Sequence, residues 1–195
     1  GDHQTADQIT TRVPLLLRWP GIEQGNKILD AFHYQIDVSA TILDLLGQRV
    51  PSNWDGRSFA QHLRQGQDGQ GQDGGRDYLV LSQAAWACQR GVRFDDYMYI
   101  HTRHDAFHLY PDEMLFNVVA DPHQRNNLSN SHAAVMSLAR AHLANWLADN
   151  APYARNRDPH DNVMSEGGPF HVRGQLADYL TRLRATNRAH CAEAL

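Results

Sequence analysis

The sequence predicts an α/β protein that carries a small antiparallel four-stranded sheet with one helix packed on it. Three observations support this fold class. A short apolar run, Leu15–Leu17, lies between turn residues, as in a strand buried on both faces of a sheet. Four segments rich in β-forming residues follow between residues 77 and 119. An amphipathic pattern over 132–150 predicts the helix.

The first part of the chain contains the buried strand and two helices. The strand should span 13–19 and end at a Pro-Gly turn, and it needs helices above and below it. It therefore indicates the end of a larger α/β sheet. Asp37 is the expected N-cap of a helix over 37–46. Ser58 is the expected cap of a short helix over 58–64.

A stretch of glycine and glutamine then separates this part from the small sheet. It has no apolar side chain to bury and predicts a flexible loop. The predicted division has four parts: 1–64, the end of the large α/β domain; 65–76, the flexible loop; 77–150, the antiparallel-sheet subdomain; and 151–195, a C-terminal tail with a helix.

The small sheet is expected from four short segments with brief links. Asp95-Asp96 reads as a hairpin between the second and third strands. The tail should be irregular over 151–164 and helical over 175–188. The predicted strands are 77–82, 89–94, 97–102 and 114–119. The apolar face of the helix over 132–150 consists of Val135, Leu138, Ala139, His142, Leu143, Trp146 and Leu147.

Composition excludes several classes of function. The formal net charge of −4 gives no basic footprint for nucleic acid. No apolar run approaches the length of a membrane span. Cys88 and Cys191 lie far apart and fit neither a zinc knuckle nor a disulfide framework. The sequence leaves open the oligomeric state and whether the compartment is the cytoplasm or the periplasm.

Three histidines, His101, His104 and His108, have a spacing that suits a metal only on a helix. Here the segment leaves a strand and heads toward a Tyr-Pro-Asp turn. A polar loop is therefore the expectation, and no metal ligand is assigned in this chain.

Four motifs follow one another in the first 130 residues. They lie at 11–21 (TRVPLLLRWPG), 34–47 (YQIDVSATILDLLG), 50–59 (Val-Pro, then WDGRSF) and 115–128 (LFNV, then ADPHQRNNL). In this order they resemble the sulfatase family of the alkaline-phosphatase-like superfamily. The resemblance implies the C-terminal part of an alkaline-phosphatase-like α/β sandwich, followed by the small antiparallel sheet.

The resemblance also implies a chemistry. Sulfatases cleave sulfate esters with a formylglycine nucleophile and a calcium ion. Neither the Cys/Ser-x-Pro/Ala-x-Arg motif of the nucleophile nor the N-terminal calcium motifs occur in this sequence. The nucleophile and calcium are therefore expected from a missing N-terminal portion, and this chain alone is expected to be inactive. Its substrate would be a small-molecule or saccharide sulfate ester, with no nucleic-acid or membrane partner.

The resemblance assigns a catalytic role to His3. It stands nine positions before Arg12, where the family has a basic residue, usually lysine, that touches the sulfate. An imidazolium there would stabilise sulfuryl oxygens or protonate the leaving oxygen, and the role would depend on pH. Asp2 is a candidate substrate-binding residue; the alternative register, a calcium motif at Asp2-His3, lacks the Gly-Glu that should follow. A solvated loop histidine is the structural alternative.

Three further residues are candidates for substrate binding. His171 and Arg173 follow a Gly-Gly pair in the tail, and sulfatase tails can fold back over the pocket. Trp86, together with Cys88 and Gln89 of the same segment, forms a second candidate rim. Simple packing of the tail helix is the alternative. Cys88 lacks the Pro-x-Arg context of a nucleophile.

Two other functions remain open. The same scaffold serves phosphoryl transfer, so a phosphodiesterase or phosphonate-type hydrolase is the first alternative. A non-catalytic binding module is the second.

Overall fold

A computed structural model of the chain describes residues 4–22, 28–65, 75–154 and 157–195. The chain forms two compact units. The first combines Gly1–Val13 with Val80–Leu195, and the second is Pro14–Leu79. None of the helices within the described ranges is both long enough and apolar enough to cross a bilayer.

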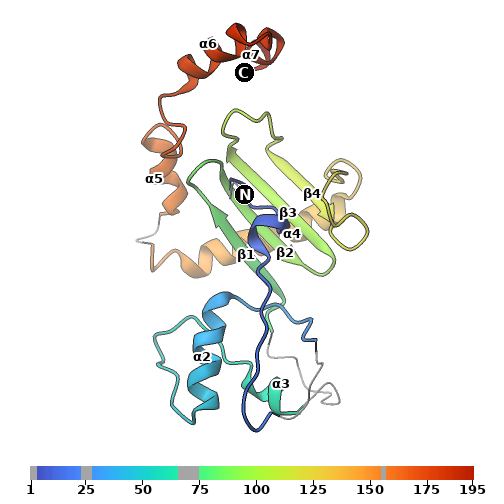
Figure 1. The fold of residues 1–195 in the computed structure, drawn as a ribbon, viewed down its shortest axis with the longest axis vertical. Coiled ribbons are helices and arrows are strands. Elements are labelled where there is room, and N and C mark those ends of the chain that lie inside the picture. The colour runs from blue at the N-terminus through green and yellow to red at the C-terminus, as the bar shows by residue number, and fades with distance from the viewer. Residues whose placement is uncertain (1–3, 23–27, 66–74, 155–156) are drawn as a thin grey trace. The chain divides into compact units, whose positions relative to one another are not determined.

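Four strands form one sheet in the order β1-β2-β3-β4 (Figure 1). β2 pairs with β3, and β3 with β4, in antiparallel register. Asp95, with a φ of 41°, makes the tight turn between β2 and β3. The predicted four-stranded sheet is thus confirmed. The strands are β1 Tyr78–Gln83, β2 Cys88–Phe94, β3 Tyr97–His104 and β4 Glu113–Asn117.

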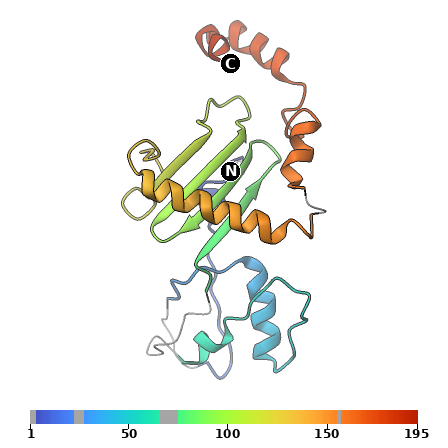
Figure 2. The ribbon, with the colours of Figure 1, turned by 180° about the vertical axis from the view of Figure 1, so that it is seen from behind.

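Helix α4, Ala133–Asn150, covers one face of the sheet, as predicted (Figure 2). The Phe94 ring lies 5.3 Å from the His142 ring, which ties β2 to the helix. The buried face of α4 differs slightly from the predicted apolar face: Leu138 is 44% exposed, and Met136 is buried instead. The fully buried positions along α4 are Met136, Ala139 and Leu143.

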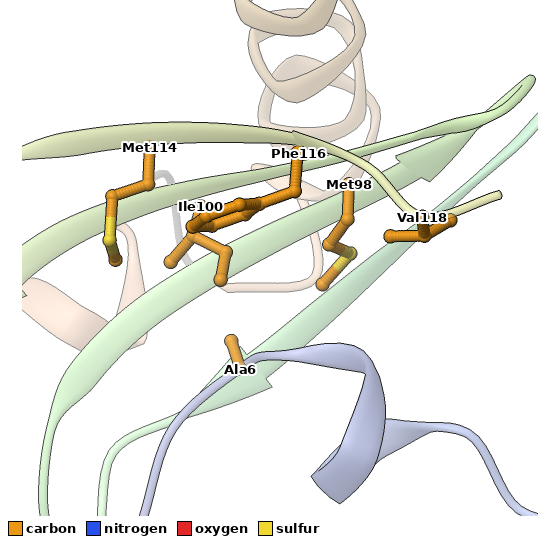
Figure 3. Close-up of a cluster of buried hydrophobic side chains, with 6 residues drawn as sticks. All are labelled: Ala6, Met98, Ile100, Met114, Phe116 and Val118. Atoms are coloured by element: carbon orange, nitrogen blue, oxygen red, sulfur yellow. The ribbon is translucent and has the colours of Figure 1, made fainter. Parts of the chain in front are cut away.

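The opposite face of the sheet packs against the N-terminal segment (Figure 3). Side chains alternate along a strand, so the residues next to those that meet α4 point to this second face. Helix α1, Gln8–Thr11, follows, and the Asp7 carboxylate caps it by accepting a hydrogen bond from the Thr10 backbone N at 3.2 Å. The buried cluster on this face consists of Ala6, Met98, Ile100, Met114, Phe116 and Val118.

The strand predicted at 13–19 is absent. Residues 12–19 form no helix or strand, and Leu16 is 98% exposed. Val13 and Leu15 are also exposed. A strand exists only when a neighbouring strand takes up its backbone hydrogen bonds, and none of the described segments pairs with this one. The prediction of a strand buried on both faces is therefore wrong for this structure.

The second unit contains α2, Gln35–Leu45, and α3, Ala60–Gln65. Tyr34, rather than Asp37, is the N-cap of α2. Asp37 is the third helical residue, and its carboxylate accepts a hydrogen bond from the Tyr34 backbone N at 2.7 Å, as in a capping box. Ser58 Oγ accepts from the Ala60 backbone N at 3.1 Å, as predicted for the start of α3.

The tail is more helical than predicted. Helix α5, Pro159–Ser165, begins inside the stretch expected to be irregular, with Asp158 as N-cap. The helix predicted over 175–188 is α6, Leu176–Ala185, which ends three residues earlier than predicted. A further helix, α7 Ala189–Ala194, follows after Asn187, which has a φ of 58°.

Candidate functional site

Three loops meet at one end of the sheet: the β1–β2 loop (84–87), the loop after β3 (105–110) and the tail loop (166–174). The end of β3 lies beside the start of β2, because Cys88 pairs with His104. The tail loop joins them through the His171 backbone N, which donates to the Ala85 carbonyl at 3.1 Å. The three loops also share a buried apolar cluster of Ala87, Ala106 and Val172.

Trp86 and His171 come together in this loop cluster. Their rings are stacked, with centroids 4.7 Å apart and planes at 18°. Trp86 is 37% exposed, and His171 is exposed, so the stack is reachable from solvent. Phe170 meets His171 edge-on at 5.3 Å and is 76% exposed. The three rings form an open aromatic surface that can bind the flat face of a ligand.

Arg173, the third predicted binding residue, lies on the same loop but is held by protein groups. Its guanidinium forms an ion pair with Glu166 at 2.9 Å and donates to the Gly168 carbonyl at 3.1 Å. Both partners of the ion pair are accessible to water, so the pair is weak and Arg173 can exchange Glu166 for a bound anion.

Gly168 allows the tail loop to lie against the sheet. Its φ is 103°, and a Cβ at this position would meet the His104 ring at 3.0 Å. A side chain would therefore strain the backbone and push the loop away from β3.

The N-terminal segment reaches the same loops. The Ala87 backbone N donates to the Gln4 carbonyl at 3.2 Å, and His108 Nε2 contacts Gln4 Oε1 at 3.1 Å. Asp2 and His3 lie outside the described residues. Gln4, the residue that follows His3 in the sequence, thus lies against the loop that carries Trp86.

The loop after β3 has an unusual backbone. Ala106, Phe107 and Leu109 all have positive φ, between 56° and 67°. Asp105 stabilises the loop because its carboxylate accepts from the backbone N of Phe107 at 3.0 Å and of Leu109 at 2.6 Å. Strained backbone of this kind is concentrated at functional sites.

Two of the three histidines singled out in the sequence, His104 and His108, have separate partners. His104 Nδ1 accepts from the Ala106 backbone N at 3.1 Å, while His108 contacts Gln4. Within the described ranges, no group of three histidine, cysteine or acidic side chains is arranged to hold a metal ion.

Cys88 is buried beneath the loop cluster, and burial raises the pKa of its thiol. A protonated, inaccessible thiol is a poor nucleophile.

The sequence did not predict that Gln4 lies at this site or that His108 contacts it. The structural feature that points to His108 is the strained backbone of its own loop, after β3.

Comparison with known proteins identifies the relatives of this chain. The family model described as "N-sulphoglucosamine sulphohydrolase, C-terminal" matches residues 2–150. The chain is 27% identical over 168 residues to a Δ4,5-hexuronate-2-O-sulfatase of Bacteroides thetaiotaomicron, covering 82% of this chain and 32% of the relative. It is 29% identical over 174 residues to the multifunctional alkaline phosphatase superfamily protein PehA of Trinickia caryophylli. This match covers 77% of this chain and 32% of the relative.

A solved structure has the same fold. The crystal structure of a candidate sulfatase from Bacteroides thetaiotaomicron matches with a TM-score of 0.55 and 28% identity, over 71% of this chain and 30% of that one. The chain spans about a third of the length of these relatives. With the family model matching three quarters of its length, the chain belongs to the sulfatase family, as its C-terminal N-sulphoglucosamine sulphohydrolase-type domain.

Proposed function

We propose that the protein to which this chain belongs hydrolyses sulfate esters of saccharides, and that this chain forms one wall of the substrate-binding site. The observation that carries the proposal is the Trp86–His171 stack, 4.7 Å between ring centroids, on loops that also contact Gln4. The relative from Bacteroides, a hexuronate-2-O-sulfatase, supports a sulfated sugar as the substrate class.

The aromatic surface suits a sugar ring. The C–H faces of a pyranose are apolar and pack on flat aromatic rings, while its hydroxyl groups stay in water. Arg173 and a protonated His171 would meet the negative charges of a sulfated or uronic acid unit. Asp2 is proposed to bind the sugar beside them.

His3 is proposed to contact the sulfuryl group. A protonated imidazole there would stabilise charge on its oxygens or give a proton to the departing sugar oxygen. The formylglycine nucleophile and calcium of the family are proposed to come from sequence outside this chain. The proposal therefore expects the 195-residue chain alone to be inactive.

The test compares Trp86→Ala with Tyr153→Ala in the complete protein. Tyr153 is also an exposed aromatic residue, 86% accessible, and lies outside the three loops. With a sulfated disaccharide, Trp86→Ala should raise KM about tenfold, a loss of about 1.4 kcal/mol in binding. Tyr153→Ala should leave KM unchanged. Equal kinetics of the two variants would refute the assignment of the sugar-binding surface.

A second candidate is hydrolysis of phosphodiesters or phosphonate monoesters. The 29% identity to PehA, a multifunctional member of the alkaline phosphatase superfamily, favours it. Parallel assays of one aryl group carried as a sulfate, a phosphodiester and a phosphonate monoester distinguish the two. Faster turnover of either phosphorus ester would replace the first proposal with the second.

A further inference from the structure

The segment Gln4–Gln8 is held on the sheet by a series of hydrogen bonds to distant residues. The Gln4 carbonyl accepts from Ala87 N at 3.2 Å, as described above. The Ala6 backbone N donates to Gln89 Oε1 at 2.9 Å, and the Gln8 backbone N donates to Gln124 Oε1 at 2.6 Å. Alternate residues of the segment are thus attached to three different parts of the first unit.

Apolar packing contributes little to this attachment. Ala6 is fully buried, but it has only one methyl group, and Ile9 is 84% exposed. A cavity of about 420 Å³ is lined by the segment and by the sheet, including Gln89, Ile100 and Phe116. Because this space is not filled by side chains, the hydrogen bonds decide where the segment lies.

Gln89 is the central attachment point. Its side chain is fully buried, and both ends of the amide are used: Oε1 accepts from Ala6 N, and Nε2 donates to Thr102 Oγ1 at 3.0 Å. The Ala6 N–H sets the orientation of the amide, because it can only donate and a flipped amide would place its NH₂ group against it, whereas the Thr102 hydroxyl can donate or accept. A buried amide is costly unless both ends are satisfied, so this orientation is strongly preferred.

Gly91, two residues along the same face of β2, permits the close approach of the segment. A Cβ on Gly91 would lie 3.2 Å from the Ala6 carbonyl oxygen and 2.6 Å from Met98 Cε. The Met98 methyl can move, but the Ala6 backbone can move only if the segment lifts. Gly91 and Gln89 therefore both determine where Ala6 lies: Gly91 leaves room for its backbone, and Gln89 accepts its N–H.

We propose that Gln89 is a positioning residue for catalysis: its amide fixes Ala6 and with it Gln4, the residue that follows the catalytic candidate His3 in the sequence, beside the Trp86 loop. The inference rests on the proposed function, since it assumes that His3 contacts the substrate. Gln89 itself touches no substrate and acts through the segment.

The experiment uses Gln89→Leu and Thr102→Val in the complete protein. Leucine keeps the approximate volume but removes the acceptor for Ala6. Valine disturbs the same buried network yet leaves that acceptor in place. Hydrogen exchange at the Ala6 amide and steady-state kinetics with a sulfate ester are measured for both, together with unfolding by urea.

Gln89→Leu should speed exchange at Ala6 and lower kcat, each at least tenfold, with KM little changed. Thr102→Val should lose similar stability but keep kcat within about twofold. Unchanged exchange in Gln89→Leu, or faster exchange with an unchanged kcat, would overturn the positioning role. Equal losses of kcat in the two variants would reduce Gln89 to a structural residue.

A second variant keeps the inference testable if Gln89→Leu does not fold. Gly91→Ala retains the Gln89 amide but crowds Ala6, and it should also speed exchange at Ala6 and lower kcat. Retention of both wild-type values would contradict the inference. If the wild-type protein hydrolyses no sulfate ester, the proposed function fails, and the exchange rates alone decide whether Gln89 anchors the segment.

Discussion

The two faces of the sheet are covered in different ways. On one face, α4 spans 18 residues and buries Met136, Ala139 and Leu143. On the other, the segment Gln4–Gln8 buries Ala6 and depends on side-chain amides for its place. The difference indicates that the helix face provides stability, whereas the segment face sets the position of residues near the candidate site. Substitutions on the two faces should therefore have separable effects.

The largest effect is expected on the helix face from Arg90→Met. The Arg90 guanidinium is nearly buried, forms an ion pair with Asp158 at 2.6 Å and lies 5.0 Å from the centroid of the Trp146 ring. Its removal leaves the largely buried Asp158 carboxylate with the more distant Arg103, at 4.0 Å, as its cationic partner and should lower the free energy of unfolding by about 3 kcal/mol. Urea denaturation measures this loss.

Arg103→Met is the matched control. Arg103 pairs with Asp161 at 2.7 Å and lies farther, at 4.0 Å, from Asp158; its side chain is 28% exposed and that of Asp161 is 42% exposed. Its replacement should cost less than about 1 kcal/mol. A larger loss from Arg103→Met than from Arg90→Met would contradict the proposed contribution of burial.

A smaller effect, and one that depends on pH, is expected from Glu113→Gln. The Glu113 carboxylate accepts from Arg140 Nε at 2.7 Å and from the Tyr99 hydroxyl at 2.5 Å. These hydrogen bonds lower the pKa of Glu113 to about 2, and the one from Arg140 has the largest effect. At pH 7 the substitution should cost roughly 1–2 kcal/mol.

The sign of the pH dependence follows from the lowered pKa. The carboxylate is protonated more readily in the unfolded chain, where its pKa is about 4.3. Its contribution to stability is therefore complete above pH 5 and is lost as pH falls toward 2. Unfolding curves of wild type and Glu113→Gln should converge over this range. A constant difference between them would disprove the role of Glu113.

A loss of stability no larger than that of Glu113→Gln is expected on the segment face from Gln124→Leu. This change removes the acceptor for the Gln8 backbone N and should lower the free energy of unfolding by about 1 kcal/mol. Hydrogen exchange at the Gln8 amide should nevertheless be faster in Gln124→Leu than in Glu113→Gln, because Gln124→Leu releases the segment and Glu113→Gln does not. The reverse order would show that the two faces are not independent.

The sheet was predictable because its pairing is local. Each strand lies next to the one that follows it in the sequence, so alternation and short turns identify both strand and partner. The segment at 13–19 has the apolar residues of a strand but no partner nearby in the sequence, and composition alone could not reveal its exposure. Helix α5 was missed because a stretch rich in Pro, Asn and Asp suggested irregular structure, whereas Pro159 occupies the first helical position, where proline is favourable.

The candidate site was predictable only in part. Trp86 and His171 were each singled out, but nothing in their local patterns indicates that rings 85 positions apart are stacked. Gln89 was predicted only as part of a rim beside Trp86, and nothing in the sequence indicates that its buried amide accepts a hydrogen bond from the Ala6 backbone N. Such roles arise from tertiary contacts between distant segments.

The contacts of the buried Asp37 in the second unit predict which of its neighbouring positions can vary among homologous sequences. Its carboxylate accepts from the Arg57 backbone N at 2.7 Å and forms an ion pair with Arg76. The contact from residue 57 uses only the backbone, so any amino acid with an N–H can make it. Loss of the acid at 37 removes the ion-pair partner of Arg76, whereas loss of Arg76 leaves Asp37 its backbone contacts with residues 34 and 57. Among homologous sequences, arginine at 76 should therefore occur mainly where position 37 is acidic, while the acid at 37 can persist without it.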